Sequence, residues 1–231
     1  MSQWSSSQIL VYGSCCSLKP DWQNVDMPIS PGSQWGEEIV RPNATRSFGS
    51  DRELGIALRD NSLTSQPQGV VQLVSEDFLS LLGLKDLTRR TTAIRILIDA
   101  LAISYTDKHG RTYQDVCIGS LHIGRTLRGT LNIVTNTGWW RGHDIAPRAH
   151  PNDGKLDIVE VAQTMTARQR ITAWKRSLVG THLPHPHIAY SQSDFYSWSG
   201  ELANLTIDGE KLGKVSHVQC RVQSDCTELT V

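Results

Sequence analysis

The sequence lacks several features that would assign it to a simple class of protein. Its 231 residues contain 23 Lys or Arg and 23 Asp or Glu, so neither sign of charge is in excess. This balance argues against a nucleic-acid partner and indicates at most peripheral membrane contact. The five cysteines are odd in number and scattered, unlike a disulfide framework, and we expect reduced thiols.

Long apolar runs are also missing. The most apolar segment, residues 94–105, is interrupted by Arg95 and Asp99 and is shorter than the roughly 20 residues that span a bilayer. The first residues have no basic region before a short apolar run, which is a poor match to a signal peptide. We therefore expect a cytoplasmic protein, and a homodimer is left open.

Residues 17–69 are rich in Pro, Ser, Gly and Asn, which indicates a loop-heavy region with short elements. Within and beside this region the pattern predicts strands over residues 9–12 and 70–74 and helices over residues 51–59 and 76–84. Strand and helix alternate, so residues 1–89 are predicted to form a small, reduced α/β region.

The pattern changes near residue 90. Residues 94–105 fit both a strand and a helix by periodicity, and we predict a strand because a turn signal and an alternating run follow. Further strands are predicted over residues 112–118, 130–136, 156–161, 203–207 and 215–222, with one helix over 167–178. The prediction is an α+β protein whose residues 90–231 form a β-sandwich domain.

Two Asp-Gly turns carry the candidate chemistry. The turn Asn152-Asp153-Gly154 is either an ordinary turn or a Mg²⁺ site in which Asp153 and backbone carbonyls supply hard oxygen ligands. The turn Asp208-Gly209-Glu210 is either a plain hairpin or the support for Glu210 as a general base.

Two other groups of residues are candidates for a function, but a structural role is favoured for each. The histidines His182, His185 and His187 are separated by prolines with no Cys or Asp cluster beside them, so a loop or edge strand is favoured over a zinc site. Trp139 and Trp140 are adjacent and could contact an acyl chain or a partner. In a strand, however, one is expected in the core and the other on the surface.

The order of these motifs resembles the diacylglycerol kinase/sphingosine kinase superfamily, over roughly residues 90–231. The resemblance implies ATP-dependent phosphoryl transfer to a lipid hydroxyl. It also implies a Mg²⁺ site formed by the carboxylate of Asp153 with the carbonyls of His150 and Lys155. Glu210 would accept the proton, with Asp208 beside it.

The sequence departs from the superfamily in its first half. The Gly-Gly-Asp-Gly-Thr phosphate loop is missing, and the nearest candidate, residues 74–78, keeps only an acid, Asp77, for nucleotide contact. Two main functions follow: a divergent lipid kinase, or a non-catalytic relative that binds a lipid or a protein. A third, weaker hypothesis is a kinase or transferase that acts on a soluble hydroxyl compound.

Overall fold

The computed structural model describes residues 36–40, 45–60, 70–83 and 92–231. Its helices are α1 (Asp51–Arg59), α2 (Glu76–Leu81) and α3 (Ala167–Ser177). Its first strands are β1 (Glu37–Val40), β2 (Thr45–Phe48), β3 (Val70–Leu73), β4 (Thr92–Asp107), β5 (Thr112–Cys117), β6 (Ser120–Gly124) and β7 (Leu131–Thr135). The later strands are β8 (Trp139–Trp140), β9 (His143–Asp144), β10 (Leu156–Val161), β11 (Ile188–Ser193), β12 (Phe195–Ile207) and β13 (Glu210–Thr230).

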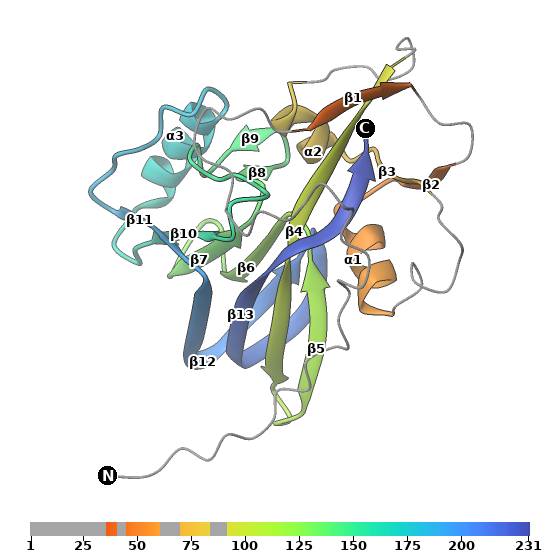
Figure 1. The fold of residues 1–231 in the computed structure, drawn as a ribbon. Coiled ribbons are helices and arrows are strands. Elements are labelled where there is room, and N and C mark those ends of the chain that lie inside the picture. Colours follow the sequence, from red (N-terminus) through yellow and green to blue (C-terminus); the bar gives the residue numbers. More distant parts are fainter. Residues whose placement is uncertain (1–35, 41–44, 61–69, 84–91) are drawn as a thin grey trace.

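Eleven strands form one sheet, with β8 and β9 as a separate hairpin. The sheet runs β1-β4-β13-β12-β6-β7-β10-β11, and β5 pairs with β4. Most pairs are antiparallel, whereas β2, β3 and the end of β13 pair in parallel. Figure 1 shows the long strands β4 and β13 crossing the molecule from the hairpin below β5 to the region of α1 and α2. The predicted α+β class with a sandwich-like β domain is confirmed.

Three apolar clusters lie along this sheet. The largest β cluster is enclosed by β4, β6, β10, β12 and β13 and includes Leu101, Leu121 and Leu156. A second cluster joins Leu54 of α1 and Phe78 of α2 to Ile98 of β4, so the N-terminal elements share a core with the long strands. The third lies between β7, β10 and α3.

The helices begin where their capping residues predict. The Ser50 side chain accepts the backbone N–H of Glu53 at the start of α1, and Thr166 and Gln169 form a capping box at the start of α3. The helix predicted over residues 76–84 ends at Leu81. The predicted strand at residues 9–12 lies outside the described residues.

Candidate active site and apolar cavity

The carboxylate of Asp208 is held by three backbone N–H groups. The residue occupies the two-residue turn between β12 and β13, where Asp208 and Gly209 have φ of 45° and 84°, as in a type I′ hairpin. The turn directs the carboxylate toward the segment after β5. There it accepts the N–H groups of Ile118, Gly119 and Ser120 at 2.9, 2.9 and 3.0 Å. Burial nevertheless raises the pKa of Asp208.

Asp51 lies beside Asp208. It is the first residue of α1, and its carboxylate accepts the Ser75 hydroxyl from the start of α2. Burial, and next the charge of Asp208, raise the pKa of Asp51 to about 7. Both carboxylates lie against Gly119. A Cβ at this position would be 2.5 Å from Asp51 Oδ2 and 3.3 Å from Asp208 Oδ1. The two acids therefore form an interacting pair in which the pKa of each is raised.

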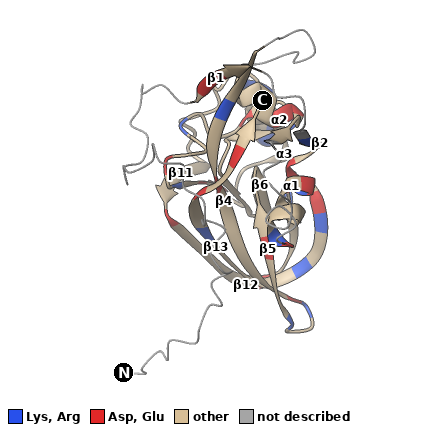
Figure 2. Ribbon diagram, turned by 45° about the vertical axis from the view of Figure 1, so that its right-hand side comes forward, with Lys and Arg blue, Asp and Glu red and all other residues tan. Residues whose placement is uncertain are grey.

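Glu210, the predicted base, lies on the outer side of this pair. One carboxylate oxygen binds Arg52 Nε, and the side chain is 49% exposed. Arg52 also binds both carboxylate oxygens of the buried Asp115, at 2.8 and 2.9 Å. Charged positions on α1 and β5 accordingly lie close together in Figure 2. Glu210 would have to leave its ion pair to accept a proton.

Asp77, predicted to contact a nucleotide, is bound to the β8–β9 hairpin. Its two oxygens accept the N–H groups of Arg141 and Gly142 at 2.8 and 2.7 Å. Both hairpin residues have positive φ, so their N–H groups point the same way. Asp77 thus joins α2 to the hairpin, and its charge is also felt by Asp51.

The other Asp-Gly turn lies elsewhere, between β9 and β10. Asp153 is partly buried, its Oδ1 accepts the N–H of Lys155 at 3.0 Å, and burial raises its pKa. His150 accepts the N–H of Asn152, and burial lowers its pKa. The structure therefore brings His150, Asp153 and Lys155 together, apart from the pair at Asp51.

Asp99, in the middle of β4, holds this turn in place. It is 1% exposed and accepts the N–H groups of Gly154 and Asp225 at 2.8 and 2.9 Å. Burial raises its pKa to about 6 against these hydrogen bonds, and the charges of Asp225 and Asp153 add to the rise. The three neighbouring carboxylates repel one another, and the backbone N–H groups that donate to Asp99 offset part of this repulsion.

Asp157 and His182 have structural roles. Asp157 is fully buried and accepts Tyr190 Oη and Gln192 Nε2 from β11. His182 is buried against the carbonyl of Ile145. Within the described ranges, no group of three or more His, Cys, Asp or Glu could hold a metal ion.

The prediction for the tryptophan pair is wrong, because both rings are half-buried. Trp140 packs edge-on against Trp174 of α3, with ring centroids 4.8 Å apart. The β8–β9 hairpin is separate from the main sheet, and Trp140 packs between residues of that sheet and α3, so the alternation expected of a regular sheet strand does not apply.

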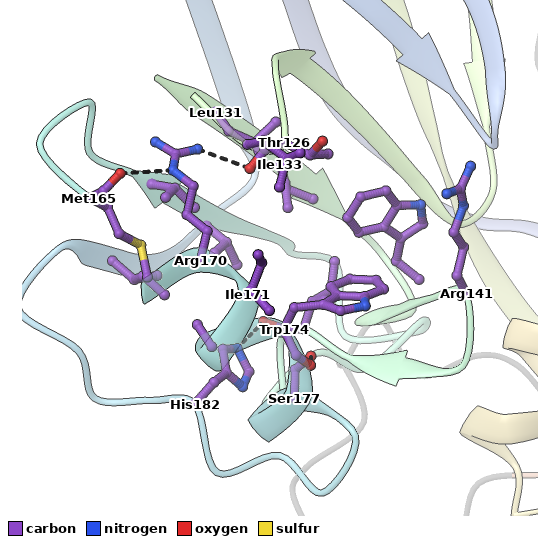
Figure 3. Close-up of a pocket in the computed structure, with 17 residues that line it drawn as sticks. Thr126, Leu131, Ile133, Arg141, Met165, Arg170, Ile171, Trp174, Ser177 and His182 are labelled. Carbon is purple, nitrogen blue, oxygen red and sulfur yellow. Dashed lines mark hydrogen bonds between the residues drawn. The ribbon is translucent and has the colours of Figure 1, made fainter. Parts of the chain in front are cut away.

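An apolar cavity of about 330 Å³ lies between α3 and the sheet. Figure 3 shows Trp174 and Ile171 of α3 facing the strand residues Leu131 and Ile133 across it. Its walls are mainly aliphatic and aromatic, and its size is at the lower end of the range for small-molecule sites. Ile171 is 48% exposed, so the cavity reaches the surface at α3.

Short contacts connect the cavity wall to the carboxylate pair. The Trp140 ring lines the cavity and contacts the His122 ring, with centroids 4.1 Å apart. His122 Nε2 lies 3.1 Å from the Ser120 hydroxyl, and the Ser120 N–H binds Asp208. Burial lowers the pKa of His122 to about 3, so this link is neutral. The cavity and the acids therefore lie on either side of β6.

Sequence reasoning missed Asp51, Asp99 and Asp115 as members of these sites. Asp51 was noted only as a helix start, and Asp99 only as an interruption in an apolar run. An acid in a run of buried strand residues is a signal for a buried, hydrogen-bonded role. The sequence carries that signal at Asp99, but it does not show that the hydrogen-bond partners are Gly154 and Asp225, which are distant in the chain.

The chain is similar to several solved structures and matches one family model. No curated protein matches the chain. Three solved structures, all from Bacillus anthracis str. Sterne, are similar to it. The first, a protein assigned as a diacylglycerol kinase, is 13% identical, with 79% of this chain and 75% of that one covered and a TM-score of 0.48.

The second, a diacylglycerol kinase by its description, is 14% identical over 70% of this chain and 66% of that one, with a TM-score of 0.41. The third, also assigned as a diacylglycerol kinase, is 12% identical over 70% and 69%, with a TM-score of 0.42. The family assignment comes from the sequence instead, where a family model matches residues 90–230. This region carries the motifs that predicted the resemblance, so that prediction is confirmed, and the chain belongs to the family of the YegS C-terminal NAD kinase β-sandwich-like domain.

Proposed function

We propose that the protein transfers a phosphoryl group to the hydroxyl of a lipid whose hydrocarbon chain lies in the cavity under α3. The observation that carries this proposal is the pairing of Asp51 with Asp208, connected through His122 and Trp140 to an apolar cavity. A base with a pKa near 7 suits proton abstraction at neutral pH. An apolar cavity that is connected to this base through Trp140 and His122 suits the hydrocarbon chain of a lipid acceptor.

Asp51 is the better candidate for the base. Its Oδ1 accepts the Ser75 hydroxyl, and in the described part of the chain its Oδ2 has no hydrogen-bond donor. Asp208 is held by three backbone N–H groups, and its main effect is to raise the pKa of Asp51. In this proposal Asp51 accepts the proton of the lipid hydroxyl, Asp208 tunes it, and Glu210 positions Arg52.

The cofactors of the proposal are Mg²⁺ and ATP, both implied by the resemblance. Asp153 and the carbonyls of His150 and Lys155, supported by Asp99, would hold Mg²⁺. A bound Mg²⁺ would supply positive charge that neutralises these carboxylates and fixes the turn.

The described residues around Asp51 do not fit a triphosphate on their own. Asp77, Asp115, Asp208 and Glu210 lie near it, against the cations Arg52 and Arg59. A net negative surround repels phosphate, so the roles above concern the acceptor hydroxyl alone.

The proposal is tested by phosphate transfer from Mg·ATP to a panel of hydroxyl lipids and soluble polyols. Asp51→Asn should lower the rate by on the order of 100-fold or more, the usual contribution of a general base. Glu210→Gln should lower it less. If Glu210→Gln abolishes transfer and Asp51→Asn does not, Glu210 is the base and our assignment is wrong.

Lipid binding is tested separately, with a fluorescent fatty-acyl probe and no nucleotide. Ala173→Leu places a larger side chain on the cavity wall and should weaken binding. Ala167→Leu makes the same change at an exposed position of the same helix and should not.

A second function is favoured by the same charges. The two oxygens of Asp77 are occupied, and the negative surround of Asp51 opposes a nucleotide. A protein that binds a lipid without turnover would bind the probe, respond to Ala173→Leu, and transfer no phosphate to any acceptor.

A further inference from the structure

The segments around the cavity mouth carry basic residues and no acidic ones. Residues 116–143 and 161–193 contain seven Lys or Arg and no Asp or Glu. These segments form β6, β7, the β8–β9 hairpin up to His143, α3 and β11. In the described part of the chain, none of the ion pairs involves these basic residues. Asp144 lies beside Gly180 at one end of this region, and burial raises its pKa.

The outer face of α3 alternates basic and apolar side chains. Arg168, Ile171, Lys175 and Leu178 are exposed and spaced three or four residues apart, so they form one stripe. Leu178 is 57% exposed, and the adjacent Val179 is 74% exposed. A stripe of this kind, with cations beside bare aliphatic side chains, is typical of helices that lie at a membrane surface.

The loop between β6 and β7 extends the same surface. Leu127 at its tip is 58% exposed, and Arg125 and Arg128 on either side are exposed as well. The buried Arg170 of α3 fixes this loop by donating to the carbonyls of Thr126 and Gly129. Figure 3 shows Arg170 reaching from α3 toward Thr126.

We propose that the outer face of α3 and residues 125–129 together form a docking surface for a bilayer that contains anionic lipid. The cations match the charge of the headgroups, and Leu127, Leu178 and Val179 would enter the apolar boundary. A nucleic acid would match the cations but would leave these aliphatic side chains exposed to water. Leu127 and Ile171 also line the cavity, so a docked protein would present the cavity mouth to membrane lipids.

This inference extends the proposed function but does not require phosphoryl transfer, and it is measured without nucleotide. The full chain is co-sedimented with vesicles of phosphatidylcholine alone or mixed with phosphatidylglycerol, at low and high salt. We expect binding only to the mixed vesicles, and release by salt.

The double variant Lys175→Ala with Arg176→Ala should weaken binding by on the order of tenfold or more, because each basic residue near an anionic surface contributes. Leu178→Ser with Val179→Ser should also weaken it. The matched control is Lys108→Ala with Lys214→Ala, two exposed lysines at the adjoining β4–β5 and β12–β13 ends. Leu202→Ser, 49% exposed on β12, controls for loss of a surface leucine.

Equal binding to both vesicle types would overturn the proposal, as would equal weakening by the control variants. A polyanion-binding surface would be identified instead by three results together. The Lys175/Arg176 variant would lose vesicle binding, the Leu178/Val179 variant would keep it, and the unaltered protein would also bind soluble heparin. Vesicle binding that follows our expectation in a protein without kinase activity would support the docking surface and reject the proposed function.

Discussion

Asp51→Asn should stabilise the protein at pH 8 and have little effect at pH 4. Burial and the charge of Asp208 raise the folded-state pKa of Asp51 from 3.8 to about 7. The folded state therefore binds the proton more tightly than the unfolded state. Stability is unaffected by this group below about pH 4 and is lost as the pH rises through 7.

The size of the effect follows from the shift. About 3 pH units correspond to about 4 kcal/mol, an upper limit, since each unit is about 1.4 kcal/mol. The charge at the start of α1 interacts favourably with the helix by up to about 1 kcal/mol, which the asparagine loses. We expect a net gain of about 3 kcal/mol at pH 8, and the asparagine oxygen can still accept the Ser75 hydroxyl.

The measurement is urea unfolding across pH 4 to 8 in EDTA, so that no cation pairs with the carboxylates. The gain corresponds to a midpoint shift of about 1 M urea. Asp60→Asn, at the other end of α1, is the control. Arg59 lowers the pKa of Asp60, so its replacement should give a small change of the opposite sign. A loss of stability in Asp51→Asn at pH 8, or an equal effect at both pH values, would refute the reasoning.

Three further outcomes test the packing around these sites. Gly119→Ala should cost about 1–3 kcal/mol in urea unfolding, because its Cβ would meet Asp51 Oδ2, whereas Gly49→Ala makes only ordinary contacts and should be nearly neutral. Asp99→Asn should cost about 1–3 kcal/mol by turning an amide NH₂ toward the N–H of Gly154 or Asp225, and any thermal stabilisation by Mg²⁺ should disappear with it. Phe78→Ala should cost about 3–5 kcal/mol if α2 shares the core of β4, whereas Val74→Ala, 38% exposed, should change stability by less than about 0.5 kcal/mol.

Local patterns predicted the secondary structure well where the physical signal is local. The acids Asp51 and Glu53 located the start of α1, and Asp-Gly located the β12–β13 turn, because both signals depend on neighbouring residues. In β10, Leu156 and Ile158 enter one core cluster and Val159 the other, as the alternation indicated.

Residues 92–107 show where local reasoning stops. Their periodicity fits helix or strand, and they are a strand because β13 and β5 pair with the two edges of β4. Those partners are distant in sequence, so propensity alone does not decide the outcome. The same holds for Trp140, which packs against Trp174 of α3.

The sequence by itself determined the fold class and the positions of both Asp-Gly turns, because the period of the hydrophobic residues and the chemistry of a turn are properties of short segments. Only the tertiary structure decided which acids meet. It brought Asp51 to Asp208 and Asp99 to the turn at Asp153, because strand pairing and helix packing join segments that are far apart in the chain. It also enclosed the cavity under α3 and placed segments without acidic residues around its mouth, since a cavity and a surface are formed by several elements at once.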